Sequence, residues 1–225
     1  MLAIITGSAF VKDSNFESEK EVSTDYGNVN VGIKDNVYFL QRHGNGVPPH
    51  KINHRANIMA LSKLGVEKII SITSCGSLKK DYPPGTILIP EDYMDLTGND
   101  TFFEEDMQFS VPGFDNHLRE ELLRIAKLEG IDVVDGGIYW QSRGPRFETK
   151  AEVKMISNFA DMVGMTMANE ATLANELGIC YANVSIIDNY AHGLTDLSIE
   201  DWQKQQEYHS KQVVPKYIEA IKGLK

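Results

Sequence analysis

Four short apolar runs of the sequence are each followed by glycines and by polar side chains that could bind an anion. Because the carboxyl ends of parallel strands meet at one edge of a sheet, ligands of open α/β sheets bind there. Small residues let backbone N–H groups approach a ligand, and the forked donors of an arginine match an oxyanion. Each group alone is ordinary turn chemistry, but their coincidence at strand ends predicts a phosphate site. The groups are Gly7-Ser8, Gln41-Arg42-His43-Gly44, Thr73-Ser74-Cys75-Gly76-Ser77 and Asp188-Asn189.

Two further segments carry residues suited to a ligand site. Met165 and Thr166 stand just before a pattern of helical period. The loop RGPRFET, residues 143–149, is punctuated by Gly-Pro and supplies the charge of Arg146. Its Phe147 could pack into the core, which is the commoner fate of a phenylalanine, or stack on a planar ligand, and spacing leaves both open.

The periodicity of the apolar residues indicates the fold that positions these side chains. Short β-branched runs alternate with amphipathic patterns of helical period, and this predicts an α/β fold whose sheet is covered on both faces. Repeats, linkers and low-complexity tracts are absent from the sequence, so we expect a single domain, residues 1–225. Expected strands are 2–6, 36–40, 68–73, 86–90 and 180–187, and expected helices are 52–65, 116–130, 148–160, 169–178 and a long one from 198.

Three local signals add detail to this outline. Asn116 is the candidate N-cap of the second expected helix. Pro215 should kink or break the terminal helix, because proline lacks the backbone N–H that the helix needs. The polar stretch 92–114 contains glycine and proline and is too long for a simple connection, which makes it a candidate functional loop.

Composition and charge narrow the class of protein. The 225 residues are 42% hydrophobic and 24% charged, which is ordinary for a globular domain. With 22 basic against 32 acidic residues the net charge is −10, which argues against a nucleic-acid-binding surface. Cys75 and Cys180 lack the spacing of metal ligands, so neither a disulfide framework nor a metal site is expected. A cytoplasmic protein without membrane contact is the default expectation, since no leader or membrane-spanning run is visible.

Seven motifs, in order along the chain, are more specific than these patterns. They are RHG at 42–44, PPHKINHRANI at 48–58, TSCGSL at 73–78, PPGTILIPEDYMD at 83–95, GPRFET at 144–149, MTMANEATLANELGICYA at 165–182 and DNYAHG at 188–193. With them the chain resembles the purine nucleoside phosphorylase and methylthioadenosine phosphorylase family over most of residues 2–194. The resemblance implies a nucleoside phosphorylase-like domain with a central mixed β-sheet flanked by helices, and a glycosyltransferase (a pentosyltransferase) of purine salvage.

The resemblance also implies roles for individual residues. Asn189 and His43 would be catalytic. No metal or cofactor is implied, and inorganic phosphate would be a co-substrate. The residues that would bind phosphate are Ser8, Arg42, His43, Thr73, Ser74 and Thr166. Those that would bind the nucleoside are Cys75, Gly76, Phe147, Met165, Asn189 and Ala191, with Met165 under the ribose and Phe147 beside the base.

The implied reaction is phosphorolysis of a purine nucleoside. Phosphate attacks the anomeric carbon while the bond to the purine breaks, so catalysis rests on holding phosphate beneath the sugar and on stabilising the negative charge that leaves with the base. The amide of Asn189 has an acceptor and donors, and it can hydrogen-bond N7 and O6 of a 6-oxopurine. The expected substrates are inosine, guanosine or 5′-methylthioinosine, which yield the free base and (5-methylthio)ribose 1-phosphate.

Methylthioadenosine phosphorolysis is a second possible activity. Relatives specific for that substrate place Asp-x-Asp where this chain has Asn189-Tyr190-Ala191. Asp188 or a water molecule would have to replace the missing acid, but by strand alternation Asp188 should point away from the ligand. Inosine and methylthioadenosine as competing substrates distinguish the two activities.

Departures from the family pattern leave two more activities open. A nucleoside-binding homologue with little turnover is indicated by Ser8-Ala9 in the first loop, where relatives have more glycine, and by Asn169, where proline usually stands. Hydrolytic relatives of the same fold are more distant, because they need no phosphate cradle of the kind that Arg42 and His43 suggest. Phosphate dependence of base release separates both from phosphorolysis.

The resemblance implies a homotrimer, or a dimer of trimers, in which the loop 92–114 of one subunit reaches a neighbour's site. The pocket for the 5′ end of the sugar should then draw on this loop, on the terminal helix and on a neighbouring subunit. Phe102, Phe103, Met107 and Phe109 form an apolar cluster in the loop, which either covers an interface or packs on its own core.

Overall fold

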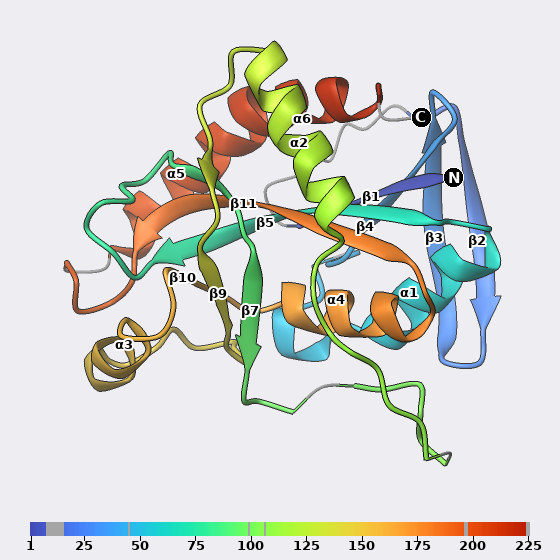
Figure 1. Cartoon of the computed structure of the whole chain (residues 1–225), viewed down its shortest axis with the longest axis horizontal. Helices are drawn as coiled ribbons and strands as arrows, with labels where there is room; N and C mark the ends of the chain where they lie inside the picture. Colours follow the sequence, from blue (N-terminus) through green and yellow to red (C-terminus); the bar gives the residue numbers. More distant parts are fainter. Residues whose placement is uncertain (8–15, 45, 99, 106, 196–197, 224–225) are drawn as a thin grey trace.

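The computed structural model describes residues 1–7, 16–44, 46–98, 100–105, 107–195 and 198–223. They form a central sheet with helices on both faces (Figure 1). The strands are β1 Leu2–Thr6, β2 Ser18–Thr24, β3 Gly27–Lys34, β4 Val37–Gln41, β5 Lys68–Ser77, β6 Ile87–Ile89, β7 Asp92–Asp95, β8 Val134–Asp135, β9 Ile138–Gln141, β10 Met162–Gly164 and β11 Cys180–Tyr190. The helices are η1 Pro49–Lys51, α1 His54–Lys63, α2 Asn116–Leu128, α3 Lys150–Ile156, α4 Met167–Glu176, α5 Ile199–Tyr208, the π-helical turn η2 His209–Val213 and α6 Val214–Ile221.

The middle of the sheet is parallel, whereas its outer strands pair in both senses: β9 pairs in parallel with β7 and β10, and β6 pairs in parallel with β8. β1 pairs in parallel with β4 and β5, and β5 pairs in parallel with β11 along its whole length. Antiparallel pairing joins β2 to β3, β3 to β4, β6 to β11 and β10 to β5. The expectation of a mixed sheet flanked by helices is confirmed.

One edge of β5 is shared by two strands that leave a gap between them. β1 pairs with residues 68–71 of β5, and β10 pairs only with Gly76 and Ser77. β11 occupies the opposite edge throughout, so residues 72–75 have a sheet partner on one side only. This gap lies at the carboxyl end of β1, where the sequence pattern placed the ligand site.

Strand alternation distributes the core over both faces of the sheet. On β5, Ile69 packs with the side chains of α1 and α4, whereas Ile70 and Ile72 pack with those of α2 and α6. Figure 1 shows α2 and α6 on one side of the sheet and α1 and α4 on the other. Apolar residues on both faces of the same strand are typical of a sheet buried between two helical layers.

Side chains cap the starts of α2 and α3, and the cap of α2 differs from the predicted one. Thr149 and Glu152 form a reciprocal capping box at the start of α3. The N-cap of α2 is Asp115 and not Asn116, because the Asp115 carboxylate accepts the backbone N–H of Leu118 at 2.7 Å. Both residue types cap well, so composition alone could not choose between neighbours.

The terminal helix is interrupted before Pro215, as expected. α5 ends at Tyr208, and one π-helical turn, η2, precedes α6. Proline cannot donate a backbone hydrogen bond to the preceding turn, and a π-turn is one way in which a helix accommodates this loss. The turn directs His209 into the protein, where the side chain is 1% exposed.

β11 is longer than the sequence indicated. It continues to Tyr190, and its register against β5 shifts between Ile187 and Asn189. Such a bulge changes the direction in which the following side chains point. The apolar run stops at Ile187, so the sequence pattern ended the strand there although the backbone pairing continues.

The loop 92–114 begins with β7 and then runs away from the sheet (Figure 1). Glu176 of α4 anchors it by accepting the Thr101 hydroxyl at 2.7 Å and the Phe102 backbone N–H at 2.6 Å. The apolar cluster is divided, because Phe102 packs on Tyr26 whereas Met107 and Phe109 are 92% and 89% exposed. Within the described ranges, no helix is long and apolar enough to cross a membrane.

His54, at the start of α1, is a buried histidine whose two ring nitrogens lack a hydrogen-bond partner among the residues that the structure describes. Its side chain is 3% exposed. Burial lowers the pKa of His54 below its ordinary 6.5, and the nearby Glu170 carboxylate only partly opposes this shift. Burial lowers the pKa of His43 as well.

We therefore predict that the fold loses stability as the pH falls below about 6.5. In that range the unfolded chain binds protons that the buried His54 and the half-buried His43 do not bind in the folded protein, at up to ~1.4 kcal/mol per pH unit for each histidine. His54→Leu should reduce the slope of unfolding free energy against pH, measured by urea denaturation at pH 5 to 7.5. Equal slopes in the two proteins would show that His54 is not buried in its neutral form.

Candidate active site

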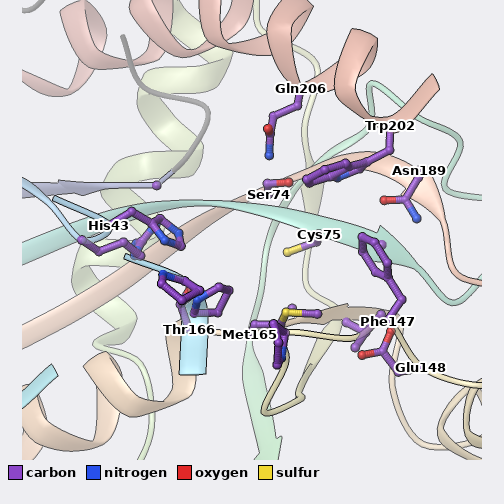
Figure 2. Close-up of a pocket in the computed structure, with 18 of the residues that line it drawn as sticks. His43, Ser74, Cys75, Phe147, Glu148, Met165, Thr166, Asn189, Trp202 and Gln206 are labelled. Carbon is purple, nitrogen blue, oxygen red and sulfur yellow. The ribbon is translucent and has the colours of Figure 1, made fainter. Parts of the chain in front are cut away.

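A cavity of about 640 Å³ opens at the carboxyl ends of the central strands, beside the gap along β5. Its walls come from the end of β4, from residues 74–76 of β5, from the segment before α3 and from the start of α4, and α5 covers it (Figure 2). Ten of the residues to which the family resemblance gave a role line it: Arg42, His43, Ser74, Cys75, Gly76, Phe147, Met165, Thr166, Asn189 and Ala191.

Two of the remaining sequence predictions have a different outcome. Ser8 lies outside the described residues. Thr73 does not line the cavity: its hydroxyl is buried beneath the floor, 3.2 Å from both Asn183 Oδ1 and Ser185 Oγ. Thr73 therefore supports the strand that carries Ser74 and Cys75, and its side chain does not point at the ligand space.

Arg42 is held by a buried ion pair. Its Nε donates to Glu170 Oε1 at 2.6 Å and its Nη2 to Oε2 at 3.1 Å, and both side chains are 1% exposed. Nη1 donates to the carbonyl of Ile72 at 2.8 Å. These bonds use three of the roughly five N–H donors of a guanidinium, so about two remain for a ligand at the cavity wall.

His43 has a defined tautomer. Its Nδ1 lies 2.7 Å from the carbonyl of Val47, and because a carbonyl can only accept, Nδ1 carries the proton. Burial lowers the pKa of His43, while this hydrogen bond works in the opposite direction. The ring is therefore neutral at pH 7 in the ligand-free cavity, with Nε2 as a lone-pair acceptor.

Cys75 lines the cavity but cannot serve as a nucleophile. Burial raises the pKa of its thiol to about 12, against weaker opposing hydrogen bonds from Ser185 and Thr73. At neutral pH it is an uncharged thiol, and the thiolate is the reactive form. Among the described residues no cluster of side chains could hold a metal ion either.

The end of the cavity opposite His43 and Thr166 is lined by an aromatic ring, a carboxylate and an amide (Figure 2). Phe147 contacts Trp202 of α5 edge-on, with ring centroids 5.6 Å apart and planes at 78°. Glu148 is 7% exposed, and its Oε1 has no partner within the described part of the chain. Asn189 donates from Nδ2 to the carbonyl of Tyr190 at 2.7 Å, which restrains the amide in one orientation.

The sequence patterns did not indicate several lining residues. Glu148 belongs to the quoted GPRFET motif, but nothing in that motif distinguishes it from a surface glutamate. Ile199, Trp202 and Gln206 line the cavity from α5. Their spacing of three and four residues marks one helical face, which was the available signal. The spacing alone does not show which part of the protein that helical face covers.

Comparison with known proteins agrees with this geometry. A model of the phosphorylase superfamily matches residues 3–219. The chain belongs to this superfamily. The match includes the C-terminal segment, where the motifs agree only loosely. This chain is 44% identical over 209 residues to a probable 6-oxopurine nucleoside phosphorylase of Archaeoglobus fulgidus. The alignment covers 89% of this chain and 86% of that protein.

Other relatives differ in the substrate that their names carry. A probable S-methyl-5′-thioinosine phosphorylase of Methanocaldococcus jannaschii is 41% identical over 204 residues, covering 87% of this chain and 81% of that protein. Among solved structures, a double mutant of the adenosine/methylthioadenosine phosphorylase of Schistosoma mansoni with adenine superposes with a TM-score of 0.87. That protein is 26% identical, and the superposition covers 99% of this chain and 91% of that one.

The buried pair provides a test of how the cavity is held. Arg42→Ala should lower the unfolding free energy by about 3–5 kcal/mol, because it leaves the Glu170 carboxylate buried without a counter-charge. Arg146→Ala is the matched control: Arg146 also forms a two-pronged pair, with Glu152 at 2.8 Å, but the arginine side chain is 67% exposed. Denaturant unfolding should show little change for the control. Similar losses in both variants would contradict a site-defining role for the buried pair.

Proposed function

We propose that this phosphorylase cleaves a 6-oxopurine nucleoside with inorganic phosphate, releasing the base for salvage and forming ribose 1-phosphate or its 5-methylthio analogue. The observation that carries the substrate preference is Oε1 of Glu148, which is buried without a hydrogen-bond partner among the described residues and belongs to the same cavity wall as Asn189. The 6-oxopurine ring has an N1–H donor, whereas adenine has an acceptor at N1. A carboxylate only accepts, so it matches the 6-oxopurine.

Asn189 complements Glu148 in this proposal. With its amide held by the carbonyl of Tyr190, Asn189 can interact with N7 and O6 of the base. As the glycosidic bond breaks, negative charge develops on the purine, and fixed hydrogen-bond donors at the ring stabilise it. Phe147 offers an aromatic surface at the same end of the cavity (Figure 2).

Phosphate is assigned to the opposite end of the cavity. Arg42, Thr166 and His43 line the cavity, and we assign the remaining N–H groups of Arg42 and the Thr166 hydroxyl to the phosphate oxygens. A bound phosphate dianion beside His43 raises the pKa of the imidazole, which turns Nε2 from an acceptor into a donor. Both reactants then lie in one cavity, and their fixed orientation supplies much of the rate enhancement.

Methylthioadenosine is the second candidate substrate, supported by relatives such as the S-methyl-5′-thioadenosine phosphorylase of Hyperthermus butylicus, which is 40% identical over 207 residues. This substrate would need Asp188 or a water molecule as an acid for the adenine ring. Asp188 does not line the cavity, and both of its carboxylate oxygens have partners, Ser74 and His209. These contacts support the expectation that Asp188 points away from the base.

A substrate panel tests the proposed function. We expect inosine or 5′-methylthioinosine to be cleaved only when phosphate is present, and at least about tenfold faster than adenosine or methylthioadenosine, since a mismatched buried hydrogen bond costs about 1–3 kcal/mol. Base release is followed by absorbance with and without phosphate. Phosphate-independent release would instead indicate a hydrolase. Faster cleavage of methylthioadenosine would establish the second candidate.

Glu148→Gln should change the preference between bases. The glutamine keeps an acceptor for N1–H but loses the charge, and its amide can donate to the N1 of adenine. We expect kcat/KM for inosine to fall about tenfold or more while that for adenosine is unchanged or rises. Measuring both substrates with the same variant makes adenosine the internal control for folding. An equal fall in kcat/KM for inosine and adenosine would show that Glu148 does not select the base.

Assembly is part of the same proposal. We infer a homotrimer or a dimer of trimers, supported by the exposure of Met107, Phe109 and Val111 at 92%, 89% and 86%. Apolar side chains so exposed within one segment are typical of an interface. Light scattering should give a mass about three or six times the 25.2 kDa of the chain. A mass of one chain at micromolar concentration would contradict the assembly.

A further inference from the structure

Hydrogen bonds among three side chains, two of them buried, connect the C-terminal segment with the cavity wall. His209 Nδ1 lies 2.5 Å from Asp188 Oδ1, and the Ser74 hydroxyl donates to Asp188 Oδ2. Asp188 and His209 are each 1% exposed. Ser74 lines the cavity, at the middle of the view in Figure 2, between the His43 end and the Asn189 end. Neither Asp188 nor His209 takes part in the phosphorolysis proposed for the cavity.

Two irregularities of the backbone bring these residues together. The register shift in β11 between Ile187 and Asn189 lets Asn189 line the cavity while Asp188 turns toward the C-terminal segment. The π-turn η2 directs His209 inward, and His209 is the only buried residue of that turn. Neither irregularity follows from the regular periodicity of its element, and π-turns are often found at functional sites.

The hydrogen bonds that link Ser74, Asp188 and His209 have a defined direction. A carboxylate can only accept, so both Ser74 and His209 must donate their protons to Asp188. A serine hydroxyl has a single proton, and here that proton points away from the cavity. The lone pairs of Ser74 Oγ therefore face the ligand space.

We propose that Asp188 and His209 are positioning residues that hold the Ser74 hydroxyl as a hydrogen-bond acceptor toward the substrate. Ser74 then selects a ligand group that carries an O–H at this point. The identity of that group rests on the proposed function, which offers two sources: the 2′- or 3′-hydroxyl of the ribose, or the protonated oxygen of inorganic phosphate. A fully ionised phosphate oxygen would be repelled by the lone pairs of Ser74.

Asp188→Asn reverses the direction of the hydrogen bond between residue 188 and Ser74. The asparagine amide can donate to Ser74 Oγ, which sends the serine proton toward the cavity and leaves a donor where an acceptor stood. Ser74→Ala removes the hydroxyl altogether. If Asp188 acts only through Ser74, its substitution has no further effect once Ser74 is alanine, which a double-mutant cycle detects.

The test is kcat/KM for inosine phosphorolysis in the wild type, Ser74→Ala, Asp188→Asn and the double variant. We expect each single substitution to lower kcat/KM about tenfold and the double variant to fall no further than Ser74→Ala. Losses that multiply, or an Asp188→Asn protein with unchanged kinetics, would overturn the proposal. If the wild type itself shows no phosphorolysis, the proposed function fails, and the same cycle is read from calorimetric binding of inosine and of inorganic phosphate.

Two deoxynucleosides identify the source of the O–H. With 2′-deoxyinosine or 3′-deoxyinosine, the effect of Asp188→Asn disappears for the substrate that lacks the ribose hydroxyl in contact with Ser74. An effect that persists with both and appears in the KM for phosphate assigns the O–H to phosphate. Persistence with both and an unchanged phosphate KM would contradict the acceptor role of Ser74.

His209 is tested by a conservative pair of variants. Asparagine can place an N–H near the position of Nδ1, so His209→Asn should retain most of the activity, whereas His209→Phe keeps a ring but removes the donor. We expect His209→Phe to show the same substrate-dependent loss as Asp188→Asn, with thermal melting as the control for folding. Equal kinetics in the two His209 variants, at equal melting temperatures, would exclude a positioning role for the imidazole.

Discussion

The buried ion pair of Arg42 and Glu170 is the interaction on which the geometry of the cavity depends. Arg42 follows β4 and Glu170 lies in the first turn of α4, while the Ile72 carbonyl that Arg42 also binds belongs to β5. One guanidinium thus fixes three elements at the gap in the sheet. A buried pair contributes little net stability after its desolvation is counted, so we attribute its importance to placement. Gly7 is part of the same constraint, because a Cβ there would lie 2.7 Å from Arg42 Nη1.

A continuous network of polar side chains extends this constraint under the floor of the cavity. The Tyr181 hydroxyl lies 3.0 Å from Glu170 Oε2 and 2.6 Å from Ser71 Oγ, and Asn183 Nδ2 donates to the same serine at 2.6 Å. Thr73 joins the network through Asn183. Buried polar groups that satisfy one another specify one arrangement of the strands that carry them. The polar residues within β5 and β11 therefore belong to the support of the site.

Much of the fold was predictable because its strands are buried on both faces and its helices are amphipathic. The alternation of such segments leads directly to the layered α/β arrangement, and the strand ends correctly indicated Arg42, His43 and Asn189 as cavity residues. The predictions that failed concern the end of β11 and the face of β5 on which Thr73 lies. The sequence could not indicate that β11 continues past Ile187 through a bulge, nor that the Thr73 side chain lies under the floor while Ser74 lines the cavity.

The missed residues have a common physical reason. Glu148 is an ordinary glutamate by sequence, and the role proposed for it rests on the burial of Oε1 without a partner among the described residues, which only the packed structure reveals. Trp202 lies on a helical face whose partner surface is formed by segments distant in the chain, including Phe147. Local patterns predict which faces are apolar, but they do not predict which distant surfaces meet.

The most direct test of the proposed site is a crystal structure of the protein with hypoxanthine and phosphate bound together. We expect hypoxanthine N1 within hydrogen-bond distance of the Glu148 carboxylate, the N7 and O6 edge of the base at Asn189, and phosphate in contact with Arg42 and Thr166. Hypoxanthine bound with its N1 away from Glu148, or phosphate bound away from Arg42, would contradict the proposed site.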